Sequence, residues 1–164
     1  STSRRQRQMC IRDRYLTMCD SLEALGYRQY EISNFSKPGK ESRHNLKYWR
    51  CEEYLGIGPA AHSFLNGKRF YTPRSFSDFY EGKTKEDGSG GTPEEYIMLA
   101  LRLCEGIQFR AYEERFQMAF PEKYIRNAMR FEKSGLLIRR KDGLHFTKEG
   151  FLLSNTLTAK ILWG

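Results

Sequence analysis

Apolar residues recur at helical spacing near the start of the chain and then give way to an aromatic stretch. Residues 15–25 carry an apolar side chain at every third position from Leu16, which predicts a helix that ends at Gly26. Residues 27–33 are rich in aromatic and β-branched side chains and predict a strand. Because a helix, a glycine turn and a strand are typical of one unit of a parallel α/β sheet, this segment predicts an α/β fold. Residues 34–40, with Pro and Gly, predict a loop.

The next forty residues alternate short periodic segments with turn residues. Residues 44–50 predict a short helix, and residues 54–59 and 61–64 predict strands. Asn66-Gly67 lies between two phenylalanines and predicts a type I′ hairpin turn, because both central residues of that turn need positive φ. Residues 75–80 predict one or two turns of helix.

A polar, glycine-rich stretch predicts a domain boundary. Residues 83–91 read KTKEDGSGG and contain no apolar side chain, so we expect a linker. Thr92, Pro93 and Glu95 then occupy the N-cap, N1 and N3 positions of a capping box. They predict a helix that closes before Gly106.

The last fifty residues predict a winged-helix-like module. Helices are expected over 112–120 and 121–134, and short strands over 136–138 and 144–146 flank the charged tip 139–143. Thr147 predicts the cap of a final helix. The sequence contains no internal repeat.

Net charge first suggests an acidic partner, but the basic start of the chain changes that interpretation. The chain carries +8 in 164 residues, which is typical of nucleic-acid binding. Residues 4–13 read RRQRQMCIRD, which ten in-frame codons of a transposase-type sequencing adapter would encode. We therefore expect residues 1–14 to be a translated adapter without regular structure. They hold five arginines and one aspartate, so the rest of the chain carries only +4.

Apolar runs and cysteines restrict the class of protein further. No run approaches the roughly 18 apolar residues of a membrane span, and no apolar leader follows the basic start. Cys19, Cys51 and Cys104 are far apart, and Cys10 lies in the adapter segment. Since zinc and iron–sulfur sites need closely spaced thiolates, we expect reduced thiols in a cytoplasmic mixed α/β protein.

The hexapeptide from His44 to Trp49 is the most informative motif. In a helix, His44 and Tyr48 stack four residues apart, with Asn45 and Trp49 beside them. One imidazole and two flat aromatic surfaces suit a porphyrin, which needs an axial donor to iron and apolar faces. The residues alone favour the plainer alternative, in which His44 and Trp49 pack at a domain edge.

A glycine-rich segment, GIGPAAH at 56–62, lies at the end of the predicted strand 54–59. Its match to a dinucleotide-binding loop of the G-x-G-x-x-A type is weak, because neither a long helix nor a suitably placed acidic residue follows it. Gly56 and Gly58 instead predict a place where the backbone approaches a ligand or a neighbour closely. His62 either faces that ligand or satisfies a hydrogen bond, and both interpretations stay open.

Three blocks carry a family resemblance: YEISNFSKPG at 30–39, SRHNLKYW at 42–49 and YLGIGPAAHS at 54–63. In this order they resemble the C-terminal part of HemW, a radical S-adenosylmethionine family of haem chaperones related to oxygen-independent coproporphyrinogen III oxidase. The resemblance covers residues 15–164. It implies that 15–82 form the last units of a partial (β/α) barrel, and that 92–164 form a small winged-helix-like cap of the HemN type.

The resemblance also implies sites. The family's HNxxYW motif assigns haem binding to His44, Asn45, Tyr48 and Trp49, with His44 as a possible iron ligand, and favours a chaperone over an oxidase. The glycine-rich strand implies that Gly56, Gly58 and His62 line the S-adenosylmethionine pocket. The family's C-x3-C-x2-C loop, which holds a [4Fe-4S] cluster, has no counterpart here, so we expect this chain alone to be inactive. Haem and haem-acceptor respiratory proteins are the implied partners.

Two other functions compete with the chaperone function. The first is radical oxidative decarboxylation of coproporphyrinogen III propionates, which needs the cluster. The second is nucleic-acid binding through a basic stripe at 3-, 4- and 3-residue spacing, formed by Lys123, Arg126, Arg130 and Lys133. Acidic neighbours favour a solvated face for that stripe. The expected role of the cap is to close the barrel mouth and exclude water.

Overall fold

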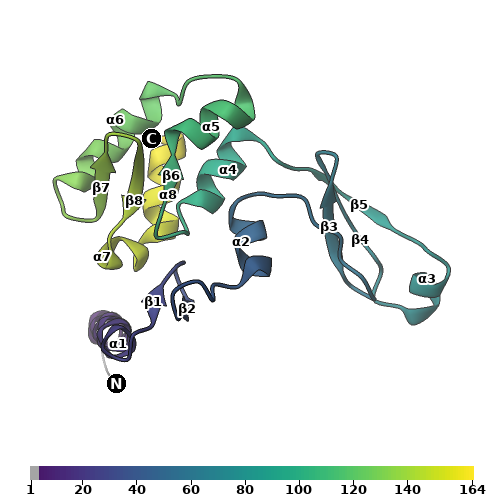
Figure 1. Cartoon of the computed structure of the whole chain (residues 1–164), viewed down its shortest axis with the longest axis horizontal. Coiled ribbons are helices and arrows are strands. Elements are labelled where there is room, and N and C mark those ends of the chain that lie inside the picture. Colours follow the sequence, from purple (N-terminus) through teal and green to yellow (C-terminus); the bar gives the residue numbers. More distant parts are fainter. Residues whose placement is uncertain (1–3) are drawn as a thin grey trace. The chain divides into compact units, whose positions relative to one another are not determined.

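The computed structural model describes residues 4–164, with side chains from residue 10, and divides into two compact units. One unit joins the residues up to Ser42 with 100–164, and the other comprises 43–99 (Figure 1). No helix within the described range 4–164 is long and apolar enough to cross a membrane.

The first unit begins with α1 (Arg4–Ala24), followed by β1 (Arg28–Gln29) and β2 (Phe35–Ser36). The predicted end of the helix is confirmed: Gly26 has a φ of +76°, and its N–H donates to the carbonyl of Glu23 at 2.9 Å. The helix starts at Arg4, however, so the expectation that this stretch lacks regular structure is wrong from residue 4 onward. Arg, Gln and Met are good helix formers, and no Gly or Pro interrupts them. Residues 1–3 lie outside the described part, and the adapter origin stays a prediction.

The strand predicted over 27–33 is mostly irregular. Only β1 pairs regularly, antiparallel to β2, and Glu31 forms an isolated bridge with Leu103. The Glu31 carboxylate, 1% exposed, accepts from the backbone N–H of Ser33 at 3.0 Å and so bends the chain back. Such a tight return allows only antiparallel pairing. All paired strands of the described residues are antiparallel, in contrast to the predicted parallel unit.

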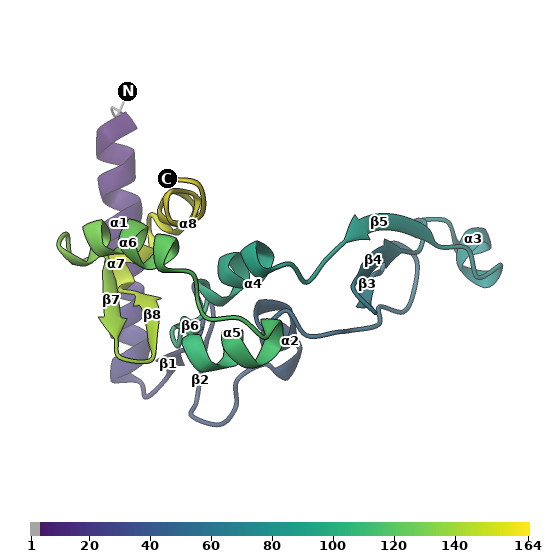
Figure 2. The same cartoon turned by 90° about the horizontal axis from the view of Figure 1, so that it is seen from above.

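The C-terminal part of this unit has the predicted winged-helix-like arrangement. Its elements are β6 (Ile107–Gln108), α5 (Phe109–Phe116), α6 (Glu122–Glu132), β7 (Leu137–Arg140), β8 (Gly143–Phe146), α7 (Lys148–Phe151) and α8 (Ser154–Trp163). The three strands pair in the order β6-β8-β7, with the hairpin β7–β8 as the wing (Figures 1 and 2). The predicted Thr147 cap is confirmed, since its hydroxyl accepts from the Gly150 N–H at 3.1 Å. The single closing helix we expected is divided into α7 and α8.

Aromatic and aliphatic side chains form the core of this module. Helix α6 buries one face, Tyr124, Ile125, Ala128 and Phe131, and packs on α8, whose Leu157 and Ile161 are buried. Tyr112 of α5 is fully buried against Phe120, with ring centroids 5.0 Å apart. The basic stripe therefore lies on the opposite, exposed face of α6, as amphipathic spacing requires.

The second unit consists of α2 (Arg43–Trp49), β3 (His62–Leu65), β4 (Lys68–Tyr71), α3 (Phe76–Tyr80), β5 (Lys85–Ser89) and α4 (Pro93–Ala100). The strands form an antiparallel sheet in chain order, and α3 lies in the connection from β4 to β5 (Figure 2). The predicted hairpin is confirmed, because Asn66 and Gly67 have φ values of 50° and 72°. The Thr92 cap is confirmed by a 3.2 Å hydrogen bond from the Glu95 N–H to its hydroxyl.

Two predictions for this unit differ from its structure. The segment 54–59 is no strand: Tyr54 alone bridges to Phe64, after which Gly58 at a φ of +116° and Pro59 turn the chain. The segment 83–91 is no free linker, because residues 85–89 form β5 and pair with β4. Every residue of β5 is exposed, so no hydrophobic pattern marks it, and cross-strand pairing alone makes it a strand.

Candidate functional site

The motif from His44 to Trp49 forms α2, as predicted, and brings two of its rings together. His44 and Tyr48 contact edge to face, with centroids 4.7 Å apart and an interplanar angle of 87°. Tyr48 in turn contacts Tyr54, at 4.4 Å and 71°. The imidazole of His44 is exposed, while both tyrosines are half-buried. Burial raises the pKa of Tyr48, and Tyr54 adds to this effect, so the phenol is neutral at physiological pH.

Tyr54 anchors this ring cluster to the sheet. Its backbone exchanges two hydrogen bonds with Phe64, both 2.9 Å long. Its hydroxyl accepts from the guanidinium of Arg69 at 3.4 Å.

Arg69 joins the sheet to the first turn of α4. Its guanidinium forms a 2.6 Å ion pair with Glu95 and lies over the ring of Phe64, 4.7 Å from the centroid. A second oxygen of Glu95 accepts from the Gly91 N–H at 2.6 Å. The ring cluster is thus held by partly buried, charge-assisted contacts, which are stronger than neutral ones.

Asn45 and Trp49 occupy the neighbouring face of α2. Both are half-buried, and the 100° rotation per residue separates them from the His44–Tyr48 face. Within the described chain, no ring contact joins Trp49 to His44. The four motif residues therefore lie on two adjacent faces of one helix, and His44 is the most accessible of them.

The glycine-rich segment confirms a close backbone approach, and the neighbour is β3. The N–H of Gly56 donates to the Ser63 hydroxyl at 3.0 Å, and a Cβ at Gly56 would lie 2.2 Å from the carbonyl oxygen of His62. No larger residue fits there. Gly58 has open space around it, so its positive φ rather than crowding requires glycine.

His62 lies on β3 with its own partners. Its ring stacks on Tyr71 at 5.2 Å, and Nδ1 is 3.5 Å from a carboxylate oxygen of Asp87. Of the two interpretations left open by the sequence, these contacts support the one in which His62 is satisfied within the chain. Its exposed side chain still leaves one edge of the ring free to meet a ligand.

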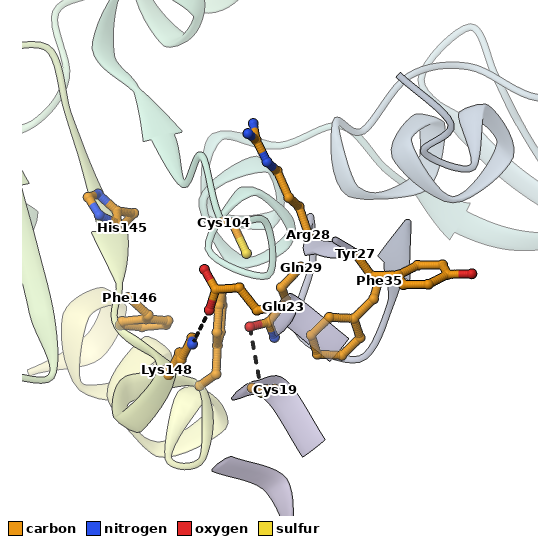
Figure 3. Close-up of a pocket in the computed structure, with 11 residues that line it drawn as sticks. Cys19, Glu23, Tyr27, Arg28, Gln29, Phe35, Cys104, His145, Phe146 and Lys148 are labelled. Carbon is orange, nitrogen blue, oxygen red and sulfur yellow. Dashed lines mark hydrogen bonds and ion pairs between the residues drawn. The ribbon is translucent and has the colours of Figure 1, made fainter. Parts of the chain in front are cut away.

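A pocket of about 300 Å³ lies in the first unit, and no sequence motif predicts it. Figure 3 shows residues of α1, the β1–β2 segment and the wing converging on it. Lys148 binds Asp20 at 3.1 Å and Glu23 at 2.9 Å and so ties α7 to α1. The pairing acts across more than 120 residues of sequence, which explains why no local pattern reveals it.

Two thiols line the same pocket. Cys19 is 1% exposed and contacts Gln29 at 3.9 Å. Burial raises the pKa of both thiols, that of Cys104 to about 12, where the charge of Glu31 adds to the effect. Both are therefore protonated and unreactive at neutral pH.

The thiols do not fit an iron–sulfur cluster. Cys51 belongs to the second unit and is 1% exposed, whereas the pocket that Cys19 and Cys104 line belongs to the first. No group of three His, Cys, Asp or Glu side chains in the described residues could hold a metal ion. A [4Fe-4S] cluster needs at least three Cys thiolates around one centre, so this set does not supply its site.

The fold and the C-terminal module define the class of protein. Residues 92–153 match the HemN C-terminal domain family. The solved structure of coproporphyrinogen III oxidase (HemN) from Escherichia coli, described as a radical SAM enzyme, is similar over 89% of this chain and 39% of its own, with a TM-score of 0.62 and 15% identity. The chain thus has the fold of the C-terminal region of a HemN-like radical SAM protein.

Sequence relatives make the similarity more specific. The chain is 32% identical to the heme chaperone HemW of Lactococcus lactis over 92% of its own length, and 30% identical to that of Bacillus subtilis over 90%. It spans 41% of each of these relatives. The chain is therefore similar to part of the HemW-type proteins, which confirms the resemblance inferred from the three blocks.

Proposed function

We propose that this chain supplies the haem-binding patch of a HemW-like haem chaperone. His44 ligates the haem iron, Tyr48 and Trp49 pack against the porphyrin, and Asn45 lines its edge. One observation carries the proposal: the exposed His44 imidazole on α2 is held edge-on by Tyr48, which packs against Tyr54.

The donor set fits haem. An axial site needs a neutral imidazole with an accessible nitrogen, and neither ring nitrogen of His44 has a hydrogen-bond partner among the described residues. The phenol of Tyr48 fixes the plane of the imidazole from one edge. Bound haem supplies the iron that the imidazole meets, and the residues of this chain bind and orient the ring.

The second part of the proposal concerns S-adenosylmethionine. We propose that Gly56, Gly58 and His62 line its pocket. The support is the open backbone at Gly58, where nothing lies within 4 Å of a built Cβ, and the exposed edge of His62. The thiols of this chain do not fit a cluster, so its proposed role toward S-adenosylmethionine is binding alone. Transfer of haem to respiratory acceptor proteins, and a cytoplasmic location, stay predictions from the family.

A haemin titration of the chain, followed through the Soret band, tests the proposal. The wild type and His62→Ala should show the same saturable shift of the band, because His62 lies outside the patch. His44→Ala should lose the shift while its far-UV circular dichroism is unchanged, because the side chain is exposed and its one ring contact among the described residues is with Tyr48. An unchanged Soret shift in His44→Ala would refute the iron-ligand assignment.

A further inference from the structure

Helix α2 carries a cationic face directly beside the His44–Tyr48 face. Arg43, Lys47 and Arg50 are spaced by four and three residues, and all three are exposed. The N–H of Arg50 donates to the Leu46 carbonyl at 2.9 Å, so the helical course includes it. At about 100° per residue, the three cations fall within a sector of roughly 60°.

The opposite flank of the His44–Tyr48 face is uncharged. Rotation by about 100° from His44 in one direction reaches Arg43 and Lys47, and in the other direction reaches Asn45 and Trp49. A flat ligand lying on His44 and Tyr48 would therefore have cations at one edge and an amide and an indole at the other. The side chains of α2 therefore change from charged on one flank of the His44–Tyr48 face to uncharged on the other.

Two of these cations, Arg43 and Lys47, are not neutralised by the described residues. Residues 40–50 contain four basic residues and one acid, Glu41, whose carboxylate accepts from the Gly39 N–H at 3.2 Å. No ion pair to a described residue engages Arg43 or Lys47. In the same unit, Lys83 pairs with both Asp78 and Glu81, so unpaired cations are not general on this surface.

Resting on the haem-binding function proposed above, we propose that Arg43 and Lys47 bind the carboxylate side chains of the porphyrin and fix its orientation on α2. The carboxylate edge lies on the cationic flank and the apolar edge on the Trp49 flank. A guanidinium matches a carboxylate in a two-point contact, and an ammonium adds a point charge. The ligand class is then a planar tetrapyrrole with ionised carboxylates on one edge, and an esterified porphyrin lacks the recognised group.

Haemin and haemin dimethyl ester, whose carboxylates are blocked, test this assignment. The double variant Arg43→Gln/Lys47→Gln should bind haemin about three- to tenfold more weakly than the wild type, as expected for two exposed ion pairs. Its affinity for the dimethyl ester should equal that of the wild type. Raising the salt concentration should weaken haemin binding to the wild type more than to the variant.

The matched control is Lys123→Gln/Arg126→Gln, which removes the same charge from the exposed face of α6. It should bind haemin as the wild type does. Equal weakening in both double variants would overturn the proposal in favour of a general charge effect, and so would an Arg43→Gln/Lys47→Gln variant with unchanged haemin affinity.

His44→Ala, titrated in parallel, separates this inference from the proposed function. If His44→Ala alone loses the Soret shift, the iron ligand stands and carboxylate recognition falls. If only the Arg43→Gln/Lys47→Gln variant weakens haemin, carboxylate recognition stands and the ligand assignment falls. If the wild type binds neither porphyrin, both are overturned.

Discussion

Replacing Gly106 by Ala tests how closely the start of β6 approaches β8 of the wing. Gly106 is buried, has a φ of +64°, and immediately precedes β6. A Cβ built there would lie 2.0 Å from the carbonyl oxygen of Leu144 and 2.6 Å from the Cβ of His145. Both neighbours belong to β8, the central strand of the sheet.

The size of the effect follows from what must move. A carbon and an oxygen need about 3.3 Å, so β6 and β8 would have to separate by more than 1 Å. Strand β8 is held on its other side by four residue pairs with β7, so β6 moves and loses its pairing with Leu144 and Gly143. The lost hydrogen bonds are two, at about 1 kcal/mol each, and the backbone strain adds about 1 kcal/mol. The free energy of unfolding should therefore fall by about 3 kcal/mol or more.

Gly135→Ala is the matched control, because Gly135 has a φ of +69° and nothing within 4 Å of its built Cβ. This variant should lose only about 1 kcal/mol of unfolding free energy. Both variants share the effect of alanine on the unfolded chain, so that effect cancels in the comparison. Urea unfolding followed by far-UV circular dichroism measures both free energies, and hydrogen exchange of the Ile107 amide reports on β6. Equal destabilisation of the two variants would refute the close approach of Gly106 to β8.

Two further predictions concern titrating groups of the first unit. Iodoacetamide at pH 8 should modify exposed Cys10 far faster than Cys19 and Cys104, because burial raises the pKa of the latter two thiols. Equal rates for the three thiols in the absence of urea would contradict the burial of Cys19 and Cys104. Burial, with Arg140 nearby, lowers the pKa of His145, so the unfolded chain binds a proton at higher pH than the folded one. The free energy of unfolding should therefore fall as pH drops below about 6.5, and His145→Gln should flatten this dependence.

Local chemistry explains the parts of the fold that were predicted correctly. Gly26, Asn66-Gly67, Thr92 and Thr147 each specify a turn or a cap through their own backbone or side chain, and the structure confirms all four. The helical spacing of residues 43–49 likewise brings His44 onto Tyr48 without help from distant residues. Such features depend on neighbours within about four positions, which the sequence displays directly.

Long-range pairing explains the parts that were missed. Strand β5 has no apolar residue, and the segment 54–59 has several, yet only the first is a strand, because β4 offers it partners. The contact of Tyr54 with Tyr48, which anchors the patch, depends on a bridge between Tyr54 and Phe64, which lie ten positions apart in the sequence.

The sequence by itself determined the resemblance to the HemW-type proteins, the caps and turns, and the helix that presents His44 beside a cationic face. Only the tertiary structure decided that Tyr54 and Arg69 hold this helix against the sheet, and that Lys148 ties α7 to α1. The physical reason is distance along the chain. Helical spacing and caps arise from adjacent residues, whereas ion pairs and strand ladders join segments that meet only after folding.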